Sequence, residues 1–302
     1  MNGENSATRL RELLAGHDIV VAPGIFNPIS ALLAERAGFR ALYFSGGAFS
    51  ASLGIPDVGL FTLSELATAV RQITTVTKLP IIVDVDTGFG GTPNVMRTVR
   101  ELEAAGAAAI HLEDQVASKR CGHLEGKQLI STEEMAEKIV AAQDARSRDL
   151  VIVARTDARG VGGLEEAIER GAAYARAGCD MVFPEALEGV AEFAAFRERV
   201  HAPLMANMTE FGKTPFITAQ EFQRQGYKLV IFPVTAFRVM LKAVDDTYRE
   251  LAQKGSQQGF ISRMMTRQEL YDVLDYDQTH DVMDRVARKA ATLVRELPRS
   301  GS

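Results

Sequence analysis

The sequence is poor in the residues that mark secreted and membrane proteins. It contains two cysteines and no tryptophan in 302 residues. Two thiols are too few for a disulfide framework, so we expect a cytoplasmic protein. No apolar run approaches the roughly 20 residues of a membrane-spanning helix, and the short polar N-terminus, Met1–Thr8, lacks the apolar core of a signal peptide. We therefore expect no membrane partner.

Strong charge of one sign is also missing. The net charge is −5, and the sequence has no basic run and no interleaving of basic with aromatic residues. Both observations argue against nucleic acid as a partner, so an anionic ligand would have to be held by a few local arginines. With 46% hydrophobic residues, the length suits one large α/β barrel or two ordinary domains.

Eight short apolar runs alternate with helical patterns along the chain. Strands that alternate with helices are typical of a parallel sheet, and eight such units close a (β/α)8 barrel of the TIM type. We predict that barrel as one domain over 1–302, with 255–302 as a C-terminal helical extension; an open doubly wound sheet is the alternative. The predicted strands are 19–22, 41–44, 80–85, 109–112, 150–154, 180–183, 203–206 and 228–232.

Capping signals bound the helical segments. A glycine after each of four helices predicts a left-handed C-terminal residue, and a threonine or serine three residues before a glutamate predicts a capping box. Proline marks two further helix starts, after Asn27 and at Thr92-Pro93. The glycines are Gly38, Gly106, Gly178 and Gly226, and the boxes begin at Thr62, Ser131, Thr218 and Thr266.

Unusual polar residues follow the predicted strands, whereas the strand starts carry few. In a barrel the carboxyl ends of all strands open onto one face, which is where barrel enzymes keep their active sites. We therefore predict an active site there rather than ordinary solvated loops. The polar groups are Ser45-Gly46-Gly47, Asp84 with Asp86, Glu113-Asp114, Arg155-Thr156-Asp157, Glu185 and Asn207-Met208-Thr209.

Asp84 and Asp86 end the apolar strand that begins at Pro80. Side chains two apart leave the same face of a strand, so both carboxylates point the same way. Two neighbouring anions are costly to bury unless a positive charge lies between them. Because Mg²⁺ prefers oxygen ligands of this kind, the pair indicates a magnesium site. The alternative is that the two aspartates only cap the following loop.

The connection 115–130, QVASKRCGHLEGKQLI, is too long for an ordinary loop. It has neither helical nor strand periodicity, and loops of this length in compact domains are often functional. Gly122 and Gly126 supply the backbone freedom that a lid needs. We therefore predict a lid over the strand ends.

Cys121 lies in this loop between Lys119-Arg120 and His123. Nearby positive charge lowers the pKa of a thiol, so we expect a tuned proton donor or acceptor. A zinc site is less well supported, because no second cysteine or histidine pair has suitable spacing. Cys179 precedes an apolar strand and is predicted to be a small core residue.

The last predicted helix carries apolar residues that the barrel does not need. They recur at helical spacing and form one stripe, which we expect to be buried against a partner subunit. The stripe consists of Val282, Met283, Val286, Ala290 and Leu293.

Together these segments resemble the isocitrate lyase and phosphoenolpyruvate mutase superfamily. The resemblance rests on the KRCGH loop, the aspartate pair and the other polar groups after the strands, and it covers nearly the whole chain in order. It implies a (β/α)8 barrel, a Mg²⁺-dependent retro-aldol cleavage, and a homotetramer that exchanges C-terminal helices between subunits. Within the superfamily, the chain looks like the branch that cleaves a tricarboxylate, 2-methylisocitrate, to pyruvate and succinate.

The resemblance also implies ligands for the metal and for the substrate. Mg²⁺, or Mn²⁺ in its place, would be held by Asp84 and Asp86, with Glu113 and Asp114 acting through water. Bidentate arginine and backbone N–H groups suit the substrate carboxylates. The implied substrate ligands are Ser45, Gly46 and Gly47 for the pyruvate half and Gly122, Arg155, Glu185, Asn207, Met208, Thr209, Arg238 and Arg267 for the carboxylates.

Two proton transfers follow from the same resemblance. Cys121 would give the proton that converts the carbanion into succinate, with His123 tuning the thiol. The base that removes the hydroxyl proton is either Asp57 or Tyr43, and the sequence does not choose between them.

The alternatives to this assignment share the fold. Isocitrate lyases are longer and carry a second lysine where Arg120 stands and a tryptophan where Gly47 stands, while 2,3-dimethylmalate lyases keep the cysteine. Alternatives of another class are a phosphoenolpyruvate mutase or an oxaloacetate decarboxylase, which lack the acid cysteine. A non-catalytic binding protein would need neither the metal carboxylates nor the thiol.

Overall fold

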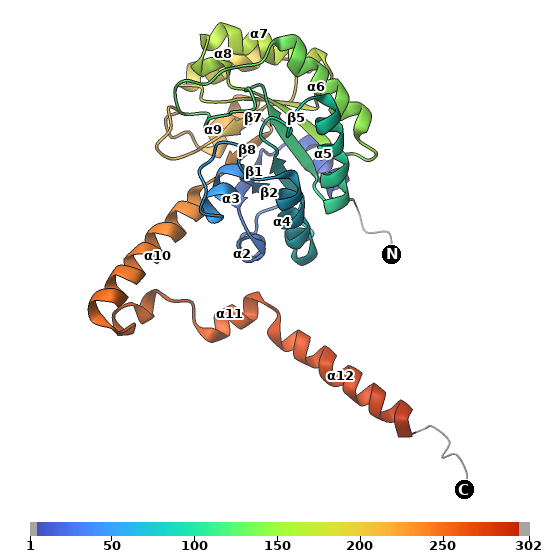
Figure 1. Cartoon of the computed structure of the whole chain (residues 1–302), viewed down its shortest axis with the longest axis vertical. Helices are drawn as coiled ribbons and strands as arrows, with labels where there is room; N and C mark the ends of the chain where they lie inside the picture. The colour runs from blue at the N-terminus through green and yellow to red at the C-terminus, as the bar shows by residue number, and fades with distance from the viewer. Residues whose placement is uncertain (1–4, 296–302) are drawn as a thin grey trace. The chain divides into compact units, whose positions relative to one another are not determined.

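The computed structural model describes residues 5–295 and divides the chain into two units, Met1–Lys242 and Ala243–Ser302 (Figure 1). The boundary falls inside helix α10, Thr235–Lys254. It therefore precedes residue 255, where the sequence predicts the C-terminal extension to begin.

A barrel of eight parallel strands forms the first unit within the described residues 5–242 (Figure 1). The sheet runs in the order β6-β5-β4-β3-β2-β1-β8-β7, and a parallel bridge between Val182 and Leu204 joins its two edges. The predicted (β/α)8 barrel is thus confirmed. The strands are β1 Val20–Ile25, β2 Leu42–Phe44, β3 Ile81–Asp84, β4 Ala109–Glu113, β5 Val151–Thr156, β6 Met181–Pro184, β7 Met205–Asn207 and β8 Leu229–Phe232.

Helices connect consecutive strands, as the right-handed crossover between parallel strands requires. The chain also has a helix before β1 and a short one directly after β2. The helices of the first unit are α1 Ser6–Ala15, α2 Pro28–Arg36, α3 Gly46–Ser52, α4 Leu63–Val76, α5 Thr92–Ala105, α6 Thr132–Ala145, the 3-10 turn η1 Ala158–Gly160, α7 Gly163–Arg176, α8 Val190–Arg199, α9 Ala219–Arg224 and the start of α10.

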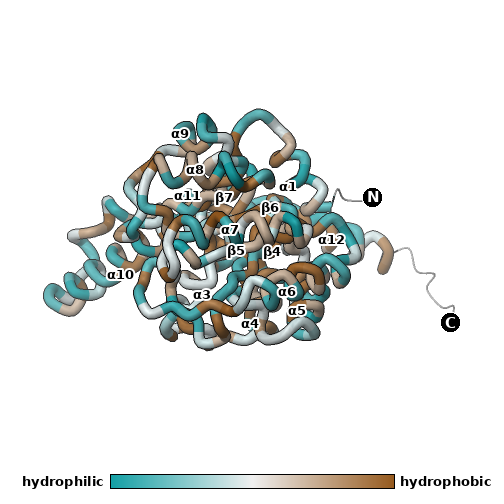
Figure 2. The backbone as a smooth tube through the Cα atoms, turned by 90° about the horizontal axis from the view of Figure 1, so that it is seen from above, coloured by the Kyte–Doolittle hydropathy of each residue, from teal (hydrophilic) through white to brown (hydrophobic). Residues whose placement is uncertain are grey.

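Two apolar layers hold the barrel together. Inside it, strand side chains such as Ile82 and Val153 pack with Leu10 of α1, and outside it side chains such as Ile110 pack against the surrounding helices. Because alternate residues of a strand face opposite sides, the strands are buried on both faces and read as continuous apolar runs. Figure 2 shows them largely in the hydrophobic colours. Cys179 is buried in the outer layer, as predicted.

The capping signals act largely as predicted. The four glycines adopt φ between +82° and +99°, and three of the four boxes are complete. Ser131 accepts a hydrogen bond from the N–H of Glu134 without a return bond. The start of α5 differs from the prediction, because Gly91 is the N-cap and Thr92 is already helical.

The second unit is helical within the described residues 243–295. It contains the end of α10, the 3-10 turn η2 Gln258–Arg263, α11 Arg267–Val273 and α12 Tyr276–Arg295. Hydrophilic and hydrophobic colours alternate along α10 and α12 (Figure 2), as they do in amphipathic helices. The apolar stripe on α12 is exposed in the single chain, with Val286 at 59% and Leu293 at 57% exposure. Its burial by a partner subunit stays a prediction.

Among the residues that the structure describes, no helix is both long enough and apolar enough to cross a membrane.

Candidate active site

A cavity of about 350 Å³ opens at the carboxyl ends of the barrel strands. Most residues proposed from the sequence line it, although they come from segments far apart in the chain. Phe183, Pro233 and Phe237 add an apolar wall that the sequence did not indicate. The predicted residues in the lining are Tyr43, Ser45, Gly47, Asp57, Asp84, Cys121, Gly122, His123, Arg155, Glu185, Asn207, Thr209 and Arg238.

Lys119 supplies a positive charge next to the aspartate pair. Its ammonium lies 2.7 Å from Asp86 Oδ1 and also bonds Asp57, and its side chain is 4% exposed. Burial disfavours the charged ammonium, but Asp86, Glu113 and Asp84 outweigh burial and raise the pKa of Lys119. The sequence predicts a positive charge between Asp84 and Asp86, with Mg²⁺ as its source, and that ion stays a prediction. In the structure the ammonium of Lys119, from the cysteine loop, bonds Asp86 and Asp57.

The two aspartates of the pair, Asp84 and Asp86, have different pKa values. The pKa of Asp86 is raised to about 7 because the carboxylate is buried and faces Asp84. Burial also opposes ionisation of Asp84, but the neighbouring His111, Lys119 and Arg155 outweigh it and lower its pKa. At neutral pH the pair is therefore poised between one and two negative charges.

The backbone approaches Asp84 very closely. The N–H of Gly46 donates to Asp84 Oδ2 at 3.3 Å, and a Cβ on Gly46 would lie 2.9 Å from the same oxygen. Only glycine fits here without movement. Ser45 serves as the N-cap of α3, since its Oγ accepts from the N–H of Ala48 at 3.2 Å. The Ser45-Gly46-Gly47 segment is thus held against the carboxylate.

Tyr43 is poorly suited to act as a base. Its Oη lies 2.6 Å from His111 Nε2 and 3.4 Å from Asp84 Oδ2. Burial, reinforced by the Asp84 carboxylate, raises the pKa of Tyr43 well above its ordinary value, so the phenol keeps its proton. Of the two candidate bases, the structure thus argues against Tyr43.

Arg155 ties three carboxylates together across the ends of β4, β5 and β6. Its Nε donates to Asp157 Oδ2 at 2.9 Å, and its terminal nitrogens lie 3.3 Å from Glu113 Oε2 and 3.6 Å from Glu185 Oε2. Burial disfavours the Glu185 carboxylate, but Arg155 and His123 outweigh it and lower the pKa of Glu185. This cluster fixes the guanidinium at the cavity wall.

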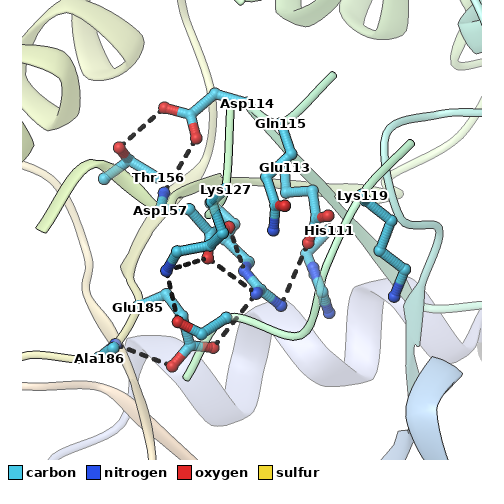
Figure 3. Close-up of polar contacts among 12 residues, drawn as sticks. His111, Glu113, Asp114, Gln115, Lys119, Lys127, Thr156, Asp157, Glu185 and Ala186 are labelled. Carbon is cyan, nitrogen blue, oxygen red and sulfur yellow. Dashed lines mark hydrogen bonds and ion pairs between the residues drawn. The ribbon is translucent and has the colours of Figure 1, made fainter. Parts of the chain in front are cut away.

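Asp114 does not belong to the cavity, which corrects the prediction of a metal ligand. Its carboxylate accepts from Thr156 Oγ1 at 2.8 Å, from the Asp157 N–H at 2.9 Å and from Tyr174 Oη at 2.7 Å. Figure 3 shows Asp114 turned toward Thr156 and away from Lys119. Adjacent residues of a strand point to opposite faces, so Glu113 faces inward and Asp114 cannot.

The cysteine loop, 115–130, is seated on the strand ends. Within it the structure has no helix or strand, as predicted, apart from a bridge between Gln115 and Leu129. Lys127 is buried and bonds both the Gly122 carbonyl and Asp157. A Cβ on Gly122 would lie 2.4 Å from Glu185 Cγ, so a residue without a side chain is needed at this contact.

The pKa of Cys121 is raised, which corrects the prediction of a thiol with a lowered pKa. Burial is the main cause, and the carboxylates of Glu185 and Asp57 add to it. The expected cations do not offset this, because Lys119 is engaged by carboxylates and Arg120 bonds the loop carbonyl of Glu125. The thiol therefore keeps its proton at neutral pH.

His123 links the cysteine loop to two other segments. Its Nε2 lies 3.1 Å from Glu185 Oε1, and its Nδ1 accepts from the N–H of Lys213 at 3.1 Å. The imidazole therefore touches the cavity through Glu185 and the loop after β7 through a backbone amide.

The residues after β7 divide between the cavity and the core. Asn207 and Thr209 line the cavity, and the Asn207 amide donates to both Glu185 oxygens. Met208 lies between them and packs in the outer apolar layer, so its predicted contact with substrate is wrong for its side chain. The alternation along an extended segment accounts for this difference.

The two predicted arginines near the C-terminus, Arg238 and Arg267, lie in different units of the chain. Arg238 lines the cavity, and its guanidinium bonds Glu210 at 3.3 Å and stacks over Phe211. Arg267 begins α11 in the second unit, so its place at the site stays a prediction.

The side chains at β3 and β4 suit a largely hydrated Mg²⁺. Asp84, Asp86 and Glu113 offer carboxylate oxygens, and Glu113 Oε1 is buried without a hydrogen-bond partner among the described residues. Across residues 5–295 no group of three His, Cys, Asp or Glu side chains is arranged to enclose an ion. Mg²⁺ commonly uses only one or two protein carboxylates and completes its shell with water and substrate, so the residues present fit this ion.

Sequence reasoning missed several residues of the site. His111, which the sequence analysis did not single out, is buried against Tyr43 and near Asp84. The sequence analysis also did not predict a role for Lys127, although it predicted that the loop 115–130 is a lid. The sequence could have indicated the ion pairs of Lys119 and Lys127, because buried carboxylates need a partner and both lysines lie in the long loop after β4.

The chain is similar to curated enzymes over almost all of its length. A family model described as phosphoenolpyruvate phosphomutase matches residues 10–252. A 2-methylisocitrate lyase of Aeropyrum pernix is 58% identical over 285 residues, covering 94% of this chain and 92% of the relative. A 2-methylisocitrate lyase of Bacillus subtilis is 46% identical, covering 95% of this chain and 94% of the relative.

Solved structures agree with these relatives. A 2,3-dimethylmalate lyase, described as a member of the PEP mutase/isocitrate lyase superfamily, matches with a TM-score of 0.88 at 36% identity, covering 94% of this chain and 96% of that chain. A phosphonopyruvate hydrolase in complex with oxalate and Mg²⁺ matches with a TM-score of 0.85 at 30% identity, covering 93% and 99%. The chain is therefore an enzyme of the phosphoenolpyruvate mutase/isocitrate lyase superfamily.

Proposed function

We propose that this protein is a Mg²⁺-dependent carbon–carbon lyase that cleaves 2-methylisocitrate to pyruvate and succinate. The names of its relatives support the substrate. The observation that carries the reaction type is the position of Cys121. Its protonated thiol borders the same cavity as the Asp84 carboxylate and Arg155, so a proton donor faces a site with metal-ligand character.

Mg²⁺, or Mn²⁺ in its place, would be held by Asp84 and Asp86, with Glu113 acting through water. When bound, the ion would supply positive charge that lowers the cost of ionising the substrate hydroxyl. The unpartnered oxygen of Glu113 and the magnesium in a related solved structure support this proposal.

The protein's own residues would perform the two proton transfers. The hydroxyl proton passes to Asp57, the carbon–carbon bond breaks with its electron pair moving to the succinate half, and that carbanion takes the proton of Cys121. Asp57 is favoured over Tyr43 because the phenol pKa is raised by burial. Arg155 and Asn207 face the succinate carboxylates, where donors help most as negative charge grows.

The lack of a side chain at Gly47, which lines the cavity, is consistent with a methylated substrate. A Cβ at Gly47 would already lie 3.1 Å from Asp57 Oδ2, so any larger residue there would fill this corner. Discrimination of one methyl group is worth about 1–3 kcal/mol in a hydrophobic pocket. We therefore expect 2-methylisocitrate to be preferred over isocitrate by a factor within roughly 10 to 200.

A comparison of four substrates tests the proposal. Purified protein with Mg²⁺ is incubated separately with 2-methylisocitrate, isocitrate, 2,3-dimethylmalate and oxaloacetate, and pyruvate, glyoxylate and succinate are quantified. We expect equal amounts of pyruvate and succinate from 2-methylisocitrate. Faster turnover of 2,3-dimethylmalate would move the assignment to that lyase, and activity only on oxaloacetate would move it to a decarboxylase.

We also propose a homotetramer, with the cytoplasm as its location. The exposed apolar stripe on α12, with Met283 and Val286 both at 59% exposure, supports burial by another subunit. Light scattering after size-exclusion chromatography tests the mass. A monomer at micromolar concentration would contradict this assembly.

A further inference from the structure

The loop between β7 and α9 touches the cysteine loop through one histidine. This latch segment, residues 208–217, brings Gly212 and Lys213 against the His123 ring. A Cβ on Gly212 would lie 2.7 Å from His123 Nδ1 and 2.8 Å from its Cε1, where ordinary contacts begin at 3.4 Å. The imidazole therefore packs on a glycine backbone and leaves no room for a side chain.

The backbone amide of Lys213 decides which ring nitrogen carries the proton. Because His123 Nδ1 accepts from the Lys213 N–H at 3.1 Å, the neutral ring must carry its hydrogen on Nε2. That nitrogen lies 3.1 Å from Glu185 Oε1. The amide thus fixes the orientation of the His123 ring, with Nε2 beside a carboxylate of the cavity wall.

The latch segment is anchored to the barrel. Thr214 Oγ1 donates to the Leu187 carbonyl at 2.6 Å, and Met208 Sδ accepts from the Ile217 N–H. On the opposite side of the contact, the cysteine loop is exposed just after His123, with Leu124 at 59% exposure. The anchored latch segment is therefore suited to hold this turn of the cysteine loop.

We propose that Gly212 and the Lys213 amide are positioning groups that hold His123, and with it Cys121, over the cavity. Cys121 and His123 share one tight turn, closed by a hydrogen bond from the Leu124 N–H to the Cys121 carbonyl at 2.9 Å. A shift of the backbone at His123 would therefore shift the backbone that carries the thiol. The activity readout of this inference rests on the proposed function, whereas its thiol readout does not.

The first test is Gly212→Ala, with Gly189→Ala as the control. Gly189 lies far along the chain before α8, its φ is 178°, and a Cβ there meets nothing within 4 Å. The readout is the rate at which DTNB labels the native protein, which reports Cys121 because Cys179 is buried in the core. We expect labelling about 3–10 times faster in Gly212→Ala and unchanged in Gly189→Ala.

Turnover provides a second readout of the same variants. A displacement of about 1 Å at a catalytic group costs on the order of 100-fold in rate, so kcat should fall by 10- to 100-fold in Gly212→Ala while KM changes less than threefold. A purely structural role for the glycine would lower the melting temperature without changing labelling below it, and that result would overturn the inference.

A second pair of variants keeps the test open if Gly212→Ala fails to fold. Lys213→Pro removes the amide N–H, whereas Lys213→Ala keeps it and trims only an exposed side chain. Faster labelling in Lys213→Pro and wild-type labelling in Lys213→Ala support the latch. Equal labelling of the two variants at the wild-type rate overturns it. Faster labelling without lyase activity on any tested substrate would instead keep the latch and refute the proposed function.

Discussion

Replacing Lys119 by methionine tests the charge balance of the aspartate pair. The substitution keeps most of the apolar stem and removes the ammonium that bonds Asp86 and Asp57. Removing one partner of a buried ion pair leaves the other charge uncompensated. The buried carboxylate relieves this by keeping a proton, so the cost of the substitution depends on pH.

The sign and size of this effect follow from the pKa of Asp86. This pKa is raised from 3.8 to about 7, so between these values the folded protein holds a proton that the unfolded chain releases. The contribution of Asp86 to the free energy of unfolding therefore falls as pH rises from about 4 to about 7. In Lys119→Met the pKa of Asp86 rises further, and the decline continues above pH 7. At about 1.4 kcal/mol per pH unit, the variant should lose a further 2 kcal/mol or so between pH 7 and pH 8.5 relative to wild type.

Urea unfolding in EDTA at pH 6.0, 7.0, 7.75 and 8.5 measures this difference. The control is Lys228→Met, because that lysine bonds the carbonyl of Gly16 at 2.8 Å rather than a carboxylate, so its loss should cost a similar amount at each pH. If the difference in the free energy of unfolding between wild type and Lys119→Met is constant from pH 7 to pH 8.5, the reasoning about Asp86 is refuted.

Three further predictions concern the metal, the thiol and the loop. Because the proposed Mg²⁺ site would use the ionised Asp86, whose pKa is about 7, the affinity for Mg²⁺ measured by calorimetry should rise between pH 6 and pH 8; a pH-independent affinity would exclude Asp86 as a ligand. Cys121→Ser should bind substrate within threefold of wild type but lose about 10²–10⁴ in kcat, measured as pyruvate release, and near-normal turnover would exclude the thiol as the acid. Gly122→Ala should lose roughly 100-fold in kcat with a melting temperature close to that of wild type, because a Cβ 2.4 Å from Glu185 unseats the loop rather than the barrel.

Local sequence signals predicted the barrel well because they act over a few residues. The apolar runs could only become strands buried on both faces, and glycines such as Gly106, with φ of +93°, ended helices as expected. The carboxyl ends of parallel strands must meet on one face. For this reason the sequence predicts Ser45, Asp84, Arg155 and Asn207 at one site, and in the structure all four line one cavity.

Contacts of the long loop were less predictable, because they depend on where a flexible segment docks. The charges around Cys121 were visible in the sequence, yet their directions were not: Lys119 turns to the aspartates and Glu185 faces the thiol. The sign of the expected pKa shift was therefore wrong. Asp114 failed for a simpler reason, since alternation along β4 allows only one of two adjacent acids to face inward.

The cysteine loop contributes two lysines that bond different carboxylates. The position of the loop is therefore linked to the charge of the site. Lys119 meets Asp57 and Asp86, while Lys127 meets Asp157. All these carboxylates would be costly to hold together without a cation. In this loop position Cys121 borders the cavity while Lys119 and Lys127 each bond carboxylates, so the placement of the proton donor and the charge balance of the site depend on the same segment.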